Sequence, residues 1–323
     1  MKKRLLFAAK LLVSSLLIWY LFSRADLSGV LSAIVMANVF WLAGALFTIY
    51  LGKVFTGYRW QVLLAAQDVH IPLRTLIASV FVGQFFNNFL PTTFGGDAAR
   101  AYDTAVYSKQ PAKSLTSLFL DRLIGVLALA LLALVGLLAG FLAHQDVLFY
   151  VGPVLGVFIF CAGIIGVVFT PAAAKLFERL LEKIGLKKAA GMVREITGSM
   201  DQIRRDRKVL LIAFLVSLAL QVNVVLFYYM IGRALAVDIS MLYYFILVPI
   251  ALVISTIPFS INGIGLREGI FVFLLNQLAV PAETAIALSL ISFGLLLTQG
   301  VVGGIIFALR GTNLSRLLHK RTT

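Results

Sequence analysis

Two polar stretches interrupt an otherwise apolar sequence, and their residue types suit the binding of an anion. Each contains proline, glycines, an arginine and an acidic residue, and each lies between an apolar run and a new helical pattern. We call residues 87–100 the first island and residues 255–268 the second island. Proline ends an incoming helix, glycine lets the backbone turn, and amides freed at the next helix start can bind an anion beside an arginine. The islands therefore predict sites for a phosphate group.

The two islands share a spacing that indicates an internal repeat. When Pro91 and Pro258 are aligned, a glycine follows five residues later and an arginine nine residues later in both islands. The offset of 167 residues is about half of the chain. Paired broken helices in corresponding halves are typical of transporters, where they form the binding site near the bilayer midplane. The alternative is that both islands are ordinary interfacial loops.

The candidate site residues fall into four groups by expected role. Those expected to hold a lipid phosphate are island arginines and glycines: Arg100, Arg267, Gly95, Gly96, Gly263 and Gly265. Those expected to balance charge, or to receive a headgroup or a proton, are charged: Asp97, Asp121, Arg122 and Glu268. Those expected to line a polar cavity are amides: Asn87, Asn88 and Asn262. The expected helix breaks are Pro91 and Pro258.

Asp121 and Arg122 follow the first island and lie about two turns into a long apolar run. A charge at membrane depth is unfavourable by several kcal/mol unless it is paired or solvated. Adjacent residues on a helix do not face each other. At least one of the two is therefore expected to find a partner elsewhere, and an island can supply it. Interfacial placement is the alternative, because Lys113 lies only eight residues before Asp121.

Composition identifies the class of protein. Of the 323 residues, 61% are hydrophobic and 13% are charged, and the mean hydropathy is +0.99. These values exclude a soluble enzyme, a disordered regulator and a fibrous protein, since soluble domains carry roughly 25% charged residues. With one cysteine, Cys161, and three scattered histidines, His70, His144 and His319, we expect no disulfide framework, metal site or cofactor. The fold class expected is an all-α polytopic membrane protein.

Apolar runs and cations predict about eight spans. Beyond residues 5–22, the runs that follow are residues 39–65, 76–90, 115–143, 147–170, 209–236, 241–257, 270–280 and 285–309. All the strongly cationic segments fall on one side if residues 76–90 dip in and return as a re-entrant broken helix. Both termini are then expected in the cytoplasm, at the cell membrane. The net charge of +14 is explained by this orientation, and no nucleic-acid partner is expected.

We expect one integral membrane domain over residues 1–323, with an internal repeat that is inverted. Its first half is residues 1–170, and its second half is residues 209–323. Residues 171–208 form a basic cytoplasmic linker with apolar residues at helical spacing, namely Leu176, Leu180, Leu181 and Ile184. This linker is either an amphipathic helix on an anionic leaflet or a solvated connection. Charge bias does not decide whether the second island enters from outside or both flanking runs cross.

These motifs resemble the membrane region of the lysylphosphatidylglycerol synthase family, also called the flippase-like domain. The resembling segments are residues 88–100, the Asp121-Arg122-…-Gly125 helix start and residues 258–268. The resemblance covers nearly the whole chain, although some members carry Glu-Arg where this chain has Asp121-Arg122. It implies a role in moving or presenting lipids across the bilayer. In multiple-peptide-resistance members a soluble aminoacyl-transferase domain follows; we expect this chain to lack it.

The leading hypothesis is therefore a translocator or headgroup-binding protein for an anionic phospholipid or a polyprenyl-phosphate-linked lipid. No Gly-x-x-x-x-Gly-Lys-Ser/Thr motif is present, so transport would be facilitated or ion-coupled. Two alternatives stay open. One is a membrane enzyme for lipid-linked glycosyl or aminoacyl transfer. The other is an accessory subunit that positions a separate synthase or transferase chain. No enzymatic activity of the chain itself is expected.

Overall fold

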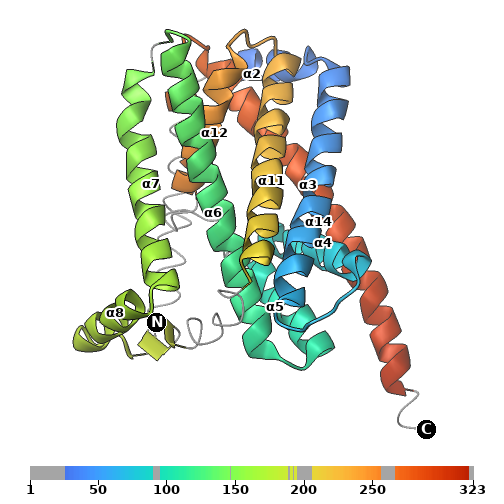
Figure 1. Cartoon of the computed structure of the whole chain (residues 1–323). Helices are drawn as coiled ribbons and strands as arrows, with labels where there is room; N and C mark the ends of the chain where they lie inside the picture. The colour runs from blue at the N-terminus through green and yellow to red at the C-terminus, as the bar shows by residue number, and fades with distance from the viewer. Residues whose placement is uncertain are drawn as a thin grey trace.

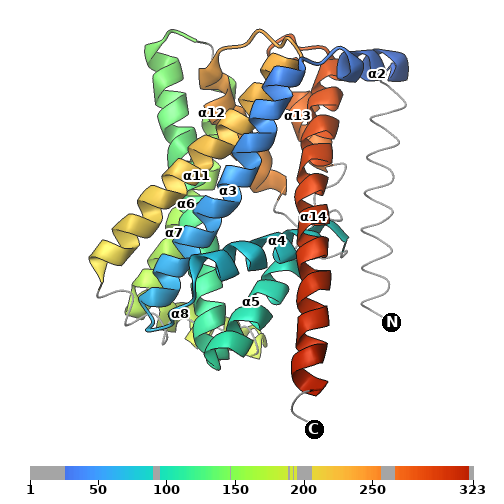
Figure 2. The same ribbon diagram turned by 90° about the vertical axis from the view of Figure 1, so that its right-hand side faces the viewer.

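The chain forms a bundle of α-helices (Figures 1 and 2). The computed structural model describes residues 26–89, 95–145, 147–187, 190–191, 193–194, 206–255 and 266–319, and no strand occurs among them. The first expected span, residues 5–22, lies outside this set. The helices are α2 (Leu27–Val35), α3 (Val39–Ala65), α4 (Leu73–Phe89), α5 (Gly95–Ser108), α6 (Pro111–Leu142), α7 (Leu148–Phe169), α8 (Pro171–Lys183), α11 (Arg207–Ala234), α12 (Met241–Ser255), α13 (Leu266–Asn276) and α14 (Ala282–His319).

Four helices are long and apolar enough to cross a membrane, within the part of the chain that the structure describes. They cover residues Val39–Ala65, Lys113–Leu142, Arg207–Ala234 and Ala282–Arg310. In Figure 1 these helices run from the upper to the lower end of the bundle, and α7 lies alongside α6. The lower end holds the α5–α6 connection, α8 and the start of α11, and we call it the basic end. These helices confirm the expected all-helical membrane fold.

Helices α4 and α5 form a hairpin that enters the bundle from the basic end and returns to it (Figure 2). They contain 17 and 14 residues. At a rise of about 1.5 Å per residue, each is at most about 25 Å long, which is shorter than the roughly 30 Å hydrocarbon core. Residues 76–89 therefore belong to the broken helix that the charge pattern predicted over residues 76–90. Residues 90–94, which include Pro91, lie outside the described residues.

Helices α12 and α13 form a second hairpin, which enters from the opposite end and occupies the upper half of the bundle in Figure 2. They contain 15 and 11 residues, so neither is long enough to cross alone. Of the two arrangements that the sequence left open, the described helices on either side of the second island fit the hairpin. Residues 256–265 lie outside the described set. Two hairpins that enter from opposite ends are the arrangement expected of an inverted repeat, which stays a prediction.

Helix α14 crosses the bundle beside the first hairpin, and a glycine allows the two to touch. A Cβ atom added at Gly303 would lie 1.9 Å from the backbone oxygen of Phe81 in α4. No real side chain tolerates this distance, so the backbones would have to separate. The close contact brings α4 against a spanning helix and keeps the hairpin inside the bundle.

Replacement of Gly303 by alanine is expected to lower stability by about 1–3 kcal/mol, because the helices can no longer touch. Gly294, in the same helix, has no atom within 4 Å of an added Cβ. Gly294→Ala is therefore the matched control and should leave stability unchanged or raise it by up to about 1 kcal/mol. Thermal unfolding of the purified variants measures the difference. Equal melting temperatures would show that α4 and α14 are not packed this closely.

The two ends of the bundle are expected on opposite sides of the membrane. Cysteines placed at Lys109, after α5, and at Asp238, before α12, are both exposed and belong to opposite ends. In a Cys161→Ser background, an impermeant maleimide added to intact cells should label Asp238→Cys but not Lys109→Cys. Both should be labelled after permeabilisation. Labelling of Lys109→Cys in intact cells would contradict the hairpin.

Candidate functional site

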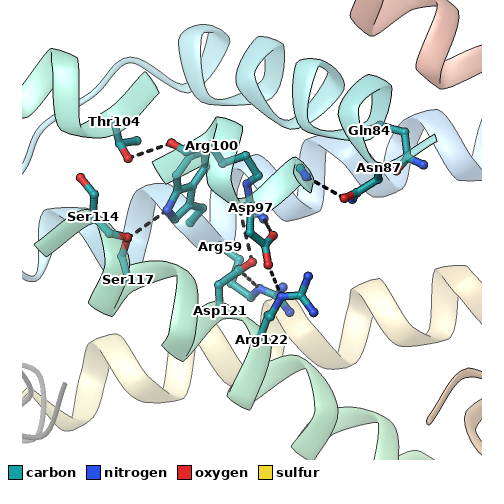
Figure 3. Close-up of polar contacts among 12 residues, drawn as sticks. Arg59, Gln84, Asn87, Asp97, Arg100, Thr104, Ser114, Ser117, Asp121 and Arg122 are labelled. Carbon is teal, nitrogen blue, oxygen red and sulfur yellow. Dashed lines mark hydrogen bonds and ion pairs between the residues drawn. The ribbon is translucent and has the colours of Figure 1, made fainter. Parts of the chain in front are cut away.

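The Asp121 carboxylate in α6 lies between two buried arginines (Figure 3). Arg59 Nε in α3 donates to Oδ1 at 2.6 Å, and Arg100 Nη2 in α5 donates to Oδ2 at 3.3 Å. Asp121 is only 2% exposed, and both arginines are buried. Charges removed from water require such partners. This contact therefore joins α3, the first hairpin and α6.

A second carboxylate extends the ion pairs toward the surface. Asp97, at the start of α5, accepts a hydrogen bond from Arg122 Nε and lies 3.7 Å from Arg100 Nη1. The Arg122 side chain is 44% exposed. Asp121 and Arg122 thus each have a partner in the first island, whereas their adjacency on one helix predicted an outside partner for at least one of them. We call Arg59, Asp97, Arg100, Asp121 and Arg122 the ion-pair network.

Arg59 was not among the predicted site residues. It lies in the long apolar run that forms α3, and its cation was attributed to orientation. In the structure its Nη1 also donates to Ser217 Oγ in α11 at 2.8 Å. The available signal was an arginine six residues from the end of a spanning run, which did not distinguish an interfacial position from a buried one.

Arg100 is held on a third side by an aromatic ring. Its guanidinium carbon lies 4.1 Å from the ring centroid of Trp60 in α3, and this cation–π contact is strengthened by burial. Trp60 is itself fixed, since its Nε1 donates to Ser117 Oγ at 3.1 Å. The Nε atom of Arg100 is buried and has no hydrogen-bond partner among the described residues.

The glycines of the first island serve close packing. The Gly96 amide donates to Asn87 Oδ1 at 2.7 Å, so a side chain of the same hairpin uses this helix-start donor. A Cβ added at Gly96 would lie 2.3 Å from the backbone oxygen of Gly83 in α4. Glycine is therefore needed at this position for α4 and α5 to approach. Gly95, its neighbour, is also buried.

A chain of polar contacts links Lys53 to the first hairpin and to α14. Lys53 Nζ donates to Gln84 Oε1 at 2.7 Å, and Gln84 Nε2 donates to Asn88 Oδ1 at 2.8 Å. Asn88 Nδ2 then donates to the Leu296 backbone oxygen at 3.2 Å. Lys53 lies near the middle of the 27-residue helix α3. A lysine at such a position is a candidate functional residue, because it is unfavourable in hydrocarbon.

The second island places Arg267 in the second position of α13. Its Nη2 donates to Glu268 Oε1 at 3.0 Å, and Ser289 Oγ in α14 donates to the same oxygen at 3.3 Å. The guanidinium carbon lies 5.7 Å from the Phe293 ring centroid. Arg267 Nε is buried and has no hydrogen-bond partner in the described part of the chain.

Lys53 and Arg267 line the same cavity. Its volume is about 300 Å³, and its walls come from α3, α11, α12, α13 and α14. The other polar lining residues are Thr56, Gln221, Asn223 and Gln299, and the rest are glycine, aliphatic or aromatic. No acidic residue is among the described lining residues. The cavity thus presents two cations, one from each half of the chain.

The cavity amides have structural contacts as well. Gln299 Nε2 donates to the Ile49 backbone oxygen at 2.7 Å, and Asn223 Nδ2 donates to the Thr48 backbone oxygen at 2.8 Å. Gln221 Nε2 donates to the Gly125 backbone oxygen at 3.1 Å. These bonds hold α14, α11 and α6 in place around the cavity.

The structure separates the two island arginines that were predicted to hold phosphate. Arg267 lines the cavity, whereas Arg100 is not among its lining residues and contacts Asp121, Asp97 and Trp60. Pro91, Pro258, Asn262, Gly263 and Gly265 lie outside the described residues. Among the residues that are described, no group of three or more His, Cys, Asp or Glu could hold a metal ion.

Comparison with known families confirms the resemblance that the island motifs indicated. The chain matches the model described as the lysylphosphatidylglycerol synthase TM region over residues 7–303. A search of curated proteins finds no match. The matched segment contains both hairpins, the ion-pair network and the cavity.

Replacement of Asp121 by asparagine is expected to destabilise the fold by about 3–5 kcal/mol, because two buried arginines lose their carboxylate. Asp103→Asn is the control, since Asp103 pairs with Arg310 at 3.0 Å and both side chains are about one-third exposed. Such a pair contributes at most about 1 kcal/mol. Thermal unfolding and monodispersity in detergent measure both variants. If they behave alike, the ion-pair network does not stabilise the hairpin.

Proposed function

The chain belongs to the lysylphosphatidylglycerol synthase TM region family, and from this premise we propose that it binds and translocates a lipid with an anionic headgroup. Membership makes it a membrane protein linked to lipid modification or translocation. The finer proposal is that its substrate is an anionic phospholipid or a polyprenyl-phosphate-linked lipid. We further propose that it lies in the cell membrane with the basic end and both termini in the cytoplasm, as the positive-inside rule favours.

The observation that carries this proposal is the cavity between Lys53 and Arg267. Two cations line it, and no described acidic residue does. The attraction between two opposite unit charges about 4 Å apart is about 4 kcal/mol at an effective dielectric constant of about 20. Phosphate oxygens make strong charge-assisted bonds to both lysine and arginine. An anion in this cavity would stabilise two charges that are otherwise unfavourable at membrane depth.

The charges around the cavity favour a ligand with at least one negative charge. Glu268 neutralises part of Arg267, but Lys53 is hydrogen-bonded to the neutral side chain of Gln84. The start of α13 adds the positive end of a helix dipole beside Arg267. The net positive charge of the site therefore comes from Lys53, which contacts no carboxylate among the described ion pairs.

The apolar part of the lining suits an amphiphile. Ile49, Leu252 and Leu296 lie on the same cavity as the two cations. A lipid is polar at its headgroup and apolar at its tail, so its junction of headgroup and tail suits a cavity that has both charged and apolar walls. Passage of the headgroup through a polar cavity avoids its transfer into hydrocarbon, which is unfavourable by several kcal/mol for a polar group.

The two hairpins give the cavity a position suited to access from both sides. Lys53 contacts the hairpin from the basic end through Gln84, and Arg267 belongs to the hairpin from the opposite end. Transporters with inverted repeats bind substrate between such elements and expose it alternately. We propose that the ion-pair network holds the first hairpin in place, and that Arg100 acts on the lipid only through this hairpin.

Lipid movement between leaflets tests the proposal directly. The protein is reconstituted in liposomes with fluorescent phosphatidylglycerol, phosphatidylcholine or polyprenyl phosphate, and the accessible fraction is measured with dithionite. Lys53→Gln and Arg267→Gln should each slow transport of anionic lipid by about 10-fold or more, since a bond to a charged group contributes about 1.5–3 kcal/mol.

Matched controls remove similar charges elsewhere. Lys113→Gln removes an amine that donates to the Gln67 backbone oxygen, and Arg310→Gln removes a guanidinium paired with Asp103. Neither residue lines the cavity, so both variants should transport at nearly the wild-type rate. Equal rates for all four variants, or equal transport of the zwitterionic lipid, would overturn the proposal.

A further inference from the structure

Helix α8 leaves the bundle axis at the basic end. Thr170 has extended backbone angles of −105° and 109°, and Pro171 begins the next helix. Proline at the first helical position is favourable but cannot continue the hydrogen bonding of a preceding helix. Consequently α7 ends at Phe169, and α8 projects sideways from the lower end of α7, away from the other helices (Figure 1).

One face of α8 is apolar and exposed. At about 100° per residue, four large apolar side chains, three from α8 and one from the residue that caps its end, fall within an arc of about 100°. They are between 40% and 67% exposed: Leu176, Phe177, Leu180 and Ile184. A surface helix normally covers such a face against a core. Here the face lies at the level where the spanning helices end, which is where a bilayer interface would meet the protein.

The charges of α8 are sorted by sign. Its two acids, Glu178 and Glu182, are both bound by Arg194, at 3.2 and 3.1 Å. The pKa of Arg194 is raised above its usual value, chiefly by the hydrogen bond to Glu178. Three cations of α8 are exposed, namely Lys175, Arg179 and Lys183. No ion pair that involves them occurs among the described residues. The surface of α8 is therefore cationic beside its apolar face.

We propose that α8 lies in the membrane interface at the basic end and gathers anionic phospholipid headgroups there. The apolar face enters the acyl-chain boundary, and the flanking lysines and arginine contact lipid phosphates. Helices with this division of faces bind interfaces through apolar area and attraction to anionic lipids together. The inference does not depend on the translocation proposal, because it uses none of the cavity residues.

Helix α2 provides a comparison within the same molecule. It lies across the opposite end of the bundle in Figure 2, and its Leu27, Leu31 and Val35 side chains are exposed. Its nine residues contain no charge. Both ends thus carry a helix with exposed apolar side chains, but only the one at the basic end carries cations. Charge complementarity with an anionic leaflet accounts for this difference.

The depth of α8 is measured on the full-length protein in liposomes that contain phosphatidylglycerol. In a Cys161→Ser background, spin labels are placed at Leu180→Cys, on the apolar face, and at Lys175→Cys, on the far side of the helix. The Leu180 label should collide with oxygen and be shielded from a water-soluble nickel complex, and the Lys175 label should show the reverse. If both labels meet nickel equally, α8 is a solvated linker; if both are shielded from both reagents, protein covers it. Either result overturns the proposal.

The preference of the protein for anionic over zwitterionic lipid tests whether α8 gathers anionic headgroups. Spin-labelled phosphatidylglycerol should be restricted by the protein at least twofold more than spin-labelled phosphatidylcholine. Lys175→Gln, Arg179→Gln and Lys183→Gln combined should abolish most of this preference. The matched control removes three exposed cations elsewhere at the basic end, in Arg74→Gln, Lys109→Gln and Lys208→Gln. An equal loss in the control would show that α8 is not the site of attraction.

Discussion

The Asp121 carboxylate lies between Arg59 and Arg100, and the packing of the basic half of the bundle depends on this contact. Each of these charges is buried, so each would be strongly unfavourable without the others. Because the three residues belong to α3, α5 and α6, the ion pairs fix the return arm of the first hairpin against two spanning helices. Trp60 adds a flat surface on which the Arg100 guanidinium rests.

The buried basic side chains fall into two groups, those of the ion-pair network and those of the cavity. Arg59, Arg100 and Arg122 share the carboxylates of Asp97 and Asp121, and these contacts stabilise the fold. Lys53 and Arg267 line the cavity instead; Arg267 pairs with Glu268, and Lys53 contacts an amide oxygen among the hydrogen bonds described. The proposed anion site therefore follows from which basic side chains line the cavity, rather than from which island contains an arginine.

The sequence predicted the elements well and the site only in part. The apolar run of residues 39–65 coincides with α3, and the broken helix of residues 76–90 follows from the side on which its flanking cations fall. Adjacency on a helix predicted an outside partner for at least one of Asp121 and Arg122, and both pair with the first island. In contrast, Arg59 and Lys53 were attributed to orientation, because composition does not show how deep a cation lies. Their contacts with Asp121 and Gln84 join residues 62 and 31 positions apart, which no local pattern encodes.

Arg267, one of the residues expected to hold a lipid phosphate, lines the cavity, whereas its cavity partner Lys53 was not among the expected site residues. The islands suggested Arg100 by symmetry, whereas Lys53 comes from the middle of an uninterrupted helix outside either island. A repeat in sequence indicates equivalent backbone breaks, and the side chains that meet across them depend on how α3 and α11 pack between the hairpins. That packing is a tertiary property.

The central claim is that a lipid phosphate lies between Lys53 and Arg267. Solid-state NMR on protein with ¹⁵N in its lysine and arginine side chains, reconstituted with an anionic phospholipid, measures this through dipolar coupling to ³¹P. Signals assigned by the Lys53→Gln and Arg267→Gln variants should both be dephased by phosphorus. Dephasing of the Arg59 or Arg100 signals, with none at Lys53 and Arg267, would place the headgroup at the ion-pair network and contradict the account.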